Sequence, residues 1–325
     1  MTVRRSCLVV IAMLTAASAA AQNRVPLDDL GRGLYLGQFE GGLYENGSNA
    51  MPSDHAAAGM AQAALVRPLD THGNPSPAGK VVMISIGMSN TTQEFCATAN
   101  PAPCSSWSFV GQAMADPAVN HSTLLFVNGA RGGQTSDSWA SPTASNYDYL
   151  RDRDLTPAGV TEAQVQVAWL KEANAQPRVS LPAADADAFR LTSQIESIVR
   201  AMKVRYPNLR LVYISSRTFA GYATTTLNPE PYAYESGLAV KWAIQSQIDQ
   251  RRDGTLDESS VPWIGWGPYL WSDTWSRGDF EGDGTHPSQS GEQKVGALLL
   301  SFFKQEPTTR PWFLATPPVR RRAVR

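Results

Sequence analysis

From residue 80 onward, short apolar runs alternate with longer amphipathic segments, and no other feature of the sequence constrains the fold as strongly. The apolar runs predict strands at residues 80–87, 122–130, 165–171, 209–216 and 261–270. The amphipathic segments predict helices at residues 105–116, 186–208, 234–252 and 288–306. Because the strands are almost continuously apolar, both faces of their sheet must be covered. The alternation therefore predicts an α/β fold, in which a parallel five-stranded sheet lies between two layers of helices.

The N-terminus lies outside this alternation and predicts export. Arg4 and Arg5 precede the apolar stretch 7–14, and small residues then lead to an A-x-A cleavage pattern that ends at Ala21. This pattern is typical of a secretory signal peptide over residues 1–21, and its apolar part is too short to span a membrane. A buried N-terminal helix is the alternative interpretation. We expect a secreted or periplasmic protein.

The remaining sequence divides into three parts. Residues 22–79 contain too few apolar residues for a core of their own, so we expect an N-terminal extension packed on the core. Residues 80–306 form the α/β domain, and residues 307–325 form a basic C-terminal tail. The formal net charge of −1 does not suggest a nucleic-acid-binding protein. No segment after the signal peptide is apolar enough for stable membrane insertion.

The cysteines predict one disulfide. Cys7 lies in the predicted signal peptide, which leaves Cys96 and Cys104 in the exported chain. An exported protein meets an oxidising compartment, so we expect these two cysteines to pair. They bracket a loop just beyond the first predicted strand, and the bridge would stiffen that loop.

A serine lies at the end of the first predicted strand, where open α/β sheets bind their ligands. Gly87 lets the chain bend sharply, and Ser89 follows it. A serine nucleophile needs a base, and of the four histidines only His286 follows the last predicted strand. Asp283, three residues earlier, could hold the imidazole in one tautomer. The alternative is that Asp283 is an ordinary turn residue.

Two further strand ends carry groups that could bind an oxyanion. The second strand ends in the glycine-rich stretch VNGARGG, and glycines leave backbone N–H groups open to a ligand. Asn174 follows the third strand. Each would be an ordinary turn if it stood alone, but together the four strand ends point a nucleophile, two donors and a base at one crevice. No Cys/His cluster has zinc-ligand spacing, so we expect neither a metal nor another cofactor.

In this order the motifs resemble the four blocks of the SGNH (GDSL-type) hydrolase superfamily. The stretches that carry the resemblance are IGMSNT at 86–91, VNGARGGQT at 127–135, VAWLKEANA at 167–175 and DGTHPS at 283–288. The resemblance implies a flavodoxin-like three-layer α/β/α sandwich and a serine esterase. The catalytic triad that it implies is Ser89, Asp283 and His286. The oxyanion hole that it implies is Ser89, Gly133 and Asn174, with Lys171 as the alternative to Asn174.

The resemblance also points to a substrate class. Asn90 after the serine and Trp169 in the third block resemble residues of the sialate O-acetylesterase and acetylxylan esterase branch. Met88, however, replaces the usual Asp before the nucleophile, and the Gln-Gly-Glu of that branch is absent. Loop aromatics suit sugar rings, unless they are core residues. We therefore expect an esterase that removes short-chain acyl (acetyl) groups from a small-molecule or polysaccharide ester. The alternatives are a GDSL-type lipase or lysophospholipase and a non-catalytic carbohydrate-binding relative. Candidate substrate-binding residues are Met88, Asn90, Trp169, Lys171, Tyr232 and Trp271.

Overall fold

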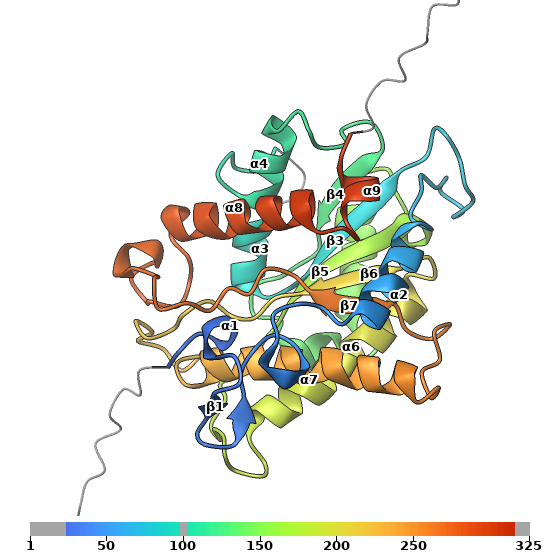
Figure 1. Ribbon diagram of the computed structural model, residues 1–325. Helices are drawn as coiled ribbons and strands as arrows, with labels where there is room; N and C mark the ends of the chain where they lie inside the picture. The colour runs from blue at the N-terminus through green and yellow to red at the C-terminus, as the bar shows by residue number, and fades with distance from the viewer. Residues whose placement is uncertain (1–23, 98–102, 316–325) are drawn as a thin grey trace, which may run out of the picture.

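The five predicted strands form one parallel sheet in the computed structural model, which describes residues 24–97 and 103–315 (Figure 1). The predicted signal peptide and residues 316–325 of the predicted tail lie outside the described residues. The strand order is β4-β3-β5-β6-β7. The strands are β3 (Val81–Gly87), β4 (Leu124–Asn128), β5 (Val165–Lys171), β6 (Leu211–Ile214) and β7 (Trp263–Trp266). The predicted α/β fold with a parallel five-stranded sheet is thus confirmed.

Helices cover both faces of the sheet (Figure 1). On one face are α3 (Ser89–Phe95), α4 (Phe109–Ala115) and α8 (Gln289–Gln305). On the other are α5 (Ser145–Leu150), α6 (Asp187–Arg205) and α7 (Tyr232–Arg252). Alternate residues of β3 serve the two cores: Val81 and Met83 pack toward α4 and α8, whereas Val82 and Ile84 pack toward α6 and α7. The seven-residue α3 was not predicted from the sequence.

The N-terminal extension packs against the α/β core and covers one edge of the sheet. Its elements are α1 (Leu27–Leu30), β1 (Leu34–Tyr35), β2 (Phe39–Glu40) and α2 (Ser53–Ala63). Helix α2 lies beside the edge strand β7, where the ring of His55 stacks on Trp263. The main-chain oxygen of Ile264 accepts a hydrogen bond from Nε2 of His55 (2.9 Å). The main-chain N–H of the same residue donates to the side chain of Gln247 (2.9 Å). Side chains therefore take up both outward-facing main-chain groups of Ile264.

Residues 307–315 differ from the predicted tail. They contain α9 (Arg310–Phe313), whose Trp312 and Phe313 are buried in the core on the α4 and α8 face. They therefore belong to the packed domain. The remaining short helical turns are Glu45–Gly47, Ser136–Trp139, Arg151–Leu155, Glu162–Gln164 and Arg277–Asp279. In the described part of the chain, no helix combines the length and apolar character that a membrane span requires.

Candidate active site

The end of β3 delivers Ser89 to the carboxyl edge of the sheet. Gly87 is in close contact with the hydroxyl of Thr91 and the main-chain oxygen of Lys171, and a Cβ atom on Gly87 would collide with both. Only glycine therefore fits where the chain leaves the sheet. Ser89 is the first residue of α3, so its N–H has no partner inside the helix.

The structure brings Ser89, His286 and Asp283 into one chain of hydrogen bonds. Nδ1 of His286 lies 2.6 Å from a carboxylate oxygen of Asp283, which fixes the tautomer with the proton on Nδ1. Nε2 is therefore an acceptor, and the hydroxyl of Ser89 donates to it over 2.8 Å. The hydroxyl, imidazole and carboxylate thus have the connectivity of a serine–histidine–aspartate triad.

The loop that carries Asp283 and His286 is fixed by further hydrogen bonds. The second carboxylate oxygen of Asp283 accepts from the main-chain N–H groups of Thr285 (2.9 Å) and His286 (3.0 Å). Burial alone would raise the pKa of Asp283, but the hydrogen bonds from His286 and Thr285 outweigh it and lower that pKa. The side chain of Asn90 donates to the main-chain oxygen of Thr285 (2.8 Å), which ties this loop to α3. Asp283 is therefore held ionised beside the imidazole.

The glycine-rich loop after β4 lies against Ser89. A Cβ atom on Gly132 would sit 3.8 Å from the Cβ atom of Ser89, and Gly133 has the left-handed φ of +75° that favours glycine. The loop is anchored by a hydrogen bond from the N–H of Arg131 to the main-chain oxygen of Gly87 (2.9 Å). Within the described residues, the N–H groups of Gly132 and Gly133 donate to no acceptor. These two exposed residues therefore offer N–H groups beside the serine.

Asn174 is not brought to this position. Its side chain is buried, donates to the main-chain oxygen of Asp187 (2.6 Å) and accepts from the hydroxyl of Ser136 (3.2 Å). Asn174 and Tyr232 line a separate small cavity beside the start of α6. The carboxamide is thus engaged in joining the loop after β5 to neighbouring elements. The structure does not bear out its predicted place in the oxyanion hole.

Most of the predicted substrate-binding residues lie in the interior. Met88, Asn90, Trp169, Lys171 and Trp271 are all buried. Trp169 stacks on Phe95 and donates to Ser215, and Trp271 donates to Glu230. Lys171, the alternative oxyanion donor, forms an ion pair with Glu94. These side chains do not present a surface to a substrate, so core packing is the correct interpretation for the two tryptophans.

The fold places two further groups near the serine that the sequence did not indicate. Glu94 of α3 pairs with Lys171 of β5, and the guanidinium carbon of Arg131 lies over the ring of the exposed Tyr149, 3.7 Å from its centroid. Arg131 stands between the glycines of the stretch VNGARGGQT, and this position in the sequence could have indicated that Arg131 lies near the serine. Cys96 and Cys104 form the predicted disulfide at the C-terminal end of α3. Among the described residues, no group of three His, Cys, Asp or Glu side chains could hold a metal ion.

Comparison with known proteins gives similarities of structure only. No family model matches the chain, and no curated protein matches it in sequence. A family 3 carbohydrate esterase from Clostridium thermocellum is 10% identical, with a TM-score of 0.41 over 69% of this chain and 94% of that one. A family two carbohydrate esterase from the same organism, solved with cellohexaose, is 15% identical, with a TM-score of 0.40 over 71% and 65%. An extracellular lipase from Streptomyces rimosus is 14% identical, with a TM-score of 0.35 over 68% and 99%.

These identities and TM-scores are low, and the chemistry assigned below rests on the geometry of the site. Ser89 follows the interior strand β3, and Asp283 with His286 follows the last strand β7. This is the arrangement expected from the resemblance to the SGNH hydrolases.

Proposed function

We propose that this chain is an exported serine esterase of the SGNH type, which removes short acyl groups, acetyl above all, from carbohydrate. The observation that carries the esterase assignment is the continuous chain of hydrogen bonds from Ser89 through His286 to Asp283. The proposed export rests on the signal-peptide pattern of residues 1–21. The disulfide, which is typical of oxidising compartments, supports it.

The geometry supports hydrolysis through an acyl-enzyme. The hydroxyl oxygen of Ser89 attacks the ester carbonyl while Nε2 of His286 accepts its proton, and Asp283 stabilises the imidazolium that forms. The N–H groups of Ser89 and of the Gly132–Gly133 loop hold the tetrahedral oxyanion. When the intermediate collapses, the C–O bond to the alcohol breaks and His286 returns the proton to the leaving oxygen. Water then attacks the acyl-serine by the same route in reverse.

Three variants test the esterase assignment. Ser89→Ala and His286→Ala should each lower kcat for p-nitrophenyl acetate by on the order of 10⁶-fold, whereas Asp283→Asn should lose on the order of 10⁴-fold. All three should melt like the wild type, and a serine-directed phosphonate should label the wild type at Ser89 only. Wild-type turnover by Ser89→Ala would refute the mechanism. A wild-type protein that resists the phosphonate would favour the non-catalytic carbohydrate-binding alternative.

One observation favours the lipase alternative. A groove of about 480 Å³ runs between α8 and the loop before Asp283, and its lining includes Leu270, Trp275, Ala297 and Leu298. This groove could hold an apolar chain, at about 0.8 kcal/mol per buried methylene, and its lining includes none of Ser89, Asp283 and His286. The ratio of kcat/KM for p-nitrophenyl acetate over the octanoate, with acetate release from acetylated xylan, decides between the two substrates. The lipase alternative predicts that kcat/KM rises steadily with acyl chain length, that Leu298→Asn abolishes this rise, and that no acetate is released from xylan. These results together would overturn the proposed substrate class.

A further inference from the structure

The helix that begins with Ser89 cannot set its own orientation. Helix α3 has only seven residues, and no side chain caps its N-terminus. Helices this short are not stable in isolation, because nucleation is costly and few hydrogen bonds follow. The direction of the serine hydroxyl must therefore come from contacts between α3 and the rest of the protein.

Lys171, the last residue of β5, makes two such contacts. Its main-chain oxygen accepts a hydrogen bond from the hydroxyl of Thr91 (2.8 Å). Its ammonium group lies 2.5 Å from each carboxylate oxygen of Glu94. In the sheet, Lys171 stands opposite Gly87, two residues before Ser89. One residue of β5 thus holds α3 near both ends of the helix.

The ion pair between Lys171 and Glu94 is wholly buried, with both side chains at 0% exposure. Taking two charges out of water costs free energy that their attraction often fails to repay, so an apolar pair of similar size would hold the fold together as well. A charged pair differs from an apolar one in direction: the ammonium and the two carboxylate oxygens fix one relative placement. The type of contact therefore favours a geometric role over a purely stabilising one.

We propose that Lys171 and Glu94 are positioning residues, which set the hydroxyl of Ser89 against Nε2 of His286. This inference rests on the proposed function of Ser89 as a nucleophile. The 2.8 Å distance between hydroxyl and imidazole tolerates little movement of α3. A misplacement of about 1 Å at a reacting centre can cost 10²-fold in rate. Neither residue touches the substrate, and both act through α3.

The test replaces the whole pair. Lys171→Met with Glu94→Met removes both charges of the pair at similar length, so neither member is left without the other, while the buried Arg217 keeps Glu172 and Glu230 as neighbouring carboxylates. This double variant should melt at or above the wild-type temperature. Its kcat for p-nitrophenyl acetate should fall between about 10-fold and 10²-fold, with KM unchanged within a factor of two. The rate at which a phosphonate labels Ser89 should fall by the same factor.

The matched control is a second lysine–carboxylate pair of equal length. Lys304 lies 2.5 Å from Asp116, at the end of α8 remote from His286. Lys304→Met with Asp116→Asn should leave kcat and the labelling rate unchanged. The labelling rate needs no knowledge of the natural ester, so it still reports on positioning if the proposed substrate class is wrong.

Wild-type kcat and labelling in the folded double variant would overturn the inference. If the double variant shows no cooperative melting, Thr91→Val takes its place, since it removes only the second contact to Lys171. It should lower kcat and the labelling rate by about threefold to tenfold at constant KM. Unchanged rates in Thr91→Val would then overturn the inference.

Discussion

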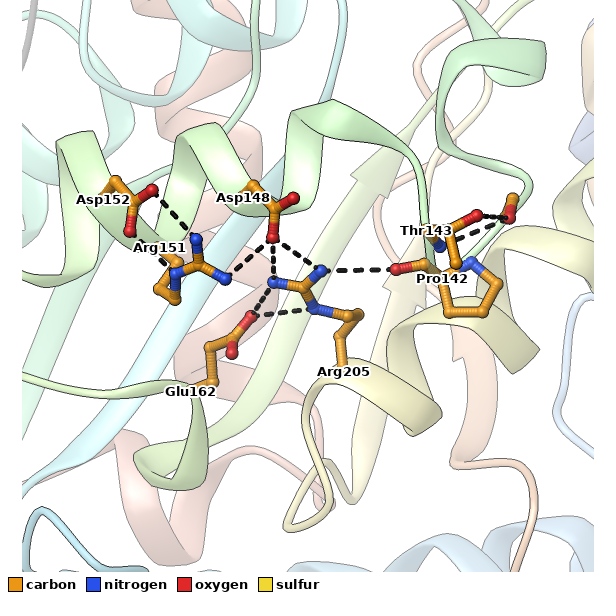
Figure 2. Close-up of polar contacts among 8 residues, drawn as sticks. Pro142, Thr143, Asp148, Arg151, Asp152, Glu162 and Arg205 are labelled. Carbon is orange, nitrogen blue, oxygen red and sulfur yellow. Dashed lines mark hydrogen bonds and ion pairs between the residues drawn. The ribbon is translucent and has the colours of Figure 1, made fainter.

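Each end of the sheet carries ion pairs between a basic side chain and carboxylates, and the two ends differ in how much solvent reaches these pairs. At the carboxyl end, Lys171 and Glu94 are sealed from water beneath Ser89. At the amino end, Arg205 lies between Asp148 and Glu162, close to where β5 begins (Figure 2). Arg151 continues this second network to Asp148 and Asp152.

Solvent is what separates the two ends. The side chains of Asp148 and Asp152 are 50% and 58% exposed, and those of Arg205 and Glu162 are 14% and 24% exposed, so water reaches the carboxylates of this network. Such pairs contribute about 0–1 kcal/mol each, and salt screens them. A buried pair is different, since removing one partner strands a charge in the interior. The amino end should therefore tolerate change, whereas the end that carries the serine should not.

The largest expected effect is that of breaking the buried pair on one side only. Lys171→Met leaves the carboxylate of Glu94 without its partner and should cost about 3–5 kcal/mol of unfolding free energy. Urea unfolding monitored by tryptophan fluorescence measures it. The double variant with Glu94→Met should recover most of this loss. A single variant as stable as the double would show that the interior accommodates the lone carboxylate and would break the comparison.

The response to alkaline pH should be smaller. Burial lowers the pKa of Lys171 to about 8; Glu94 opposes this shift and repulsion from Arg217 adds to it. The unfolded chain, with a lysine pKa near 10.5, binds more protons between pH 8 and 10.5, so stability rises with pH in that window. Across this window Lys171 should raise the free energy of unfolding by an amount on the order of 3 kcal/mol.

Urea unfolding from pH 7 to 11 tests this, because the rise attributable to Lys171 should be missing in the double variant. Equal pH slopes in the two proteins would mean that folding does not shift the pKa of Lys171.

The exposed network should respond at acidic pH instead. There the hydrogen bond from Arg151 lowers the pKa of Asp152, so its contribution is lost as pH falls through that lowered value.

The smallest expected effect belongs to the exposed network. Arg205→Met should cost about 1 kcal/mol or less in dilute buffer, and the loss should shrink in 1 M NaCl. Its kcat should equal that of the wild type, since Arg205 lies at the far end of the sheet. Unfolding curves at low and high salt provide the measurement. If Arg205→Met lost more than about 2 kcal/mol of unfolding free energy at both salt concentrations, Arg205 would behave like the buried pair, and the two ends of the sheet would not differ.

The sequence predicted the sheet well because its strands are short apolar runs bounded by turn residues. The predicted stretch 165–171 coincides with β5, and 80–87 differs from β3 by one residue. Helix α3 was missed since seven residues with two adjacent threonines show no helical period. Residues 307–315 were assigned to the tail because an isolated Trp312–Phe313 pair gives no pattern, although the core buries both.

The candidate site was predictable where chemistry and chain order coincide. Asp283 and His286 are three residues apart, so local sequence alone suggests their contact, and the strand ends add Ser89. Burial is what the sequence does not reveal. Trp169 and Trp271 stand at strand ends and in loops as sugar-stacking residues would, yet both lie in the core. Asn174 follows β5 as expected, but its amide is bound to Asp187.

The edge strand β7 has a consequence for the behaviour of the protein at high concentration. An exposed edge of a sheet offers unpaired N–H and C=O groups that can recruit a strand from another molecule. Here Gln247 and His55 occupy both main-chain groups of Ile264. Burial lowers the pKa of His55 to about 4, so the ring is neutral across the neutral range, with Nε2 donating to Ile264 and Nδ1 free to accept from Arg251. Helix α2 of the N-terminal extension thus protects this edge of the sheet from edge-to-edge association, and its removal would open the main-chain oxygen of Ile264 to a strand of another molecule.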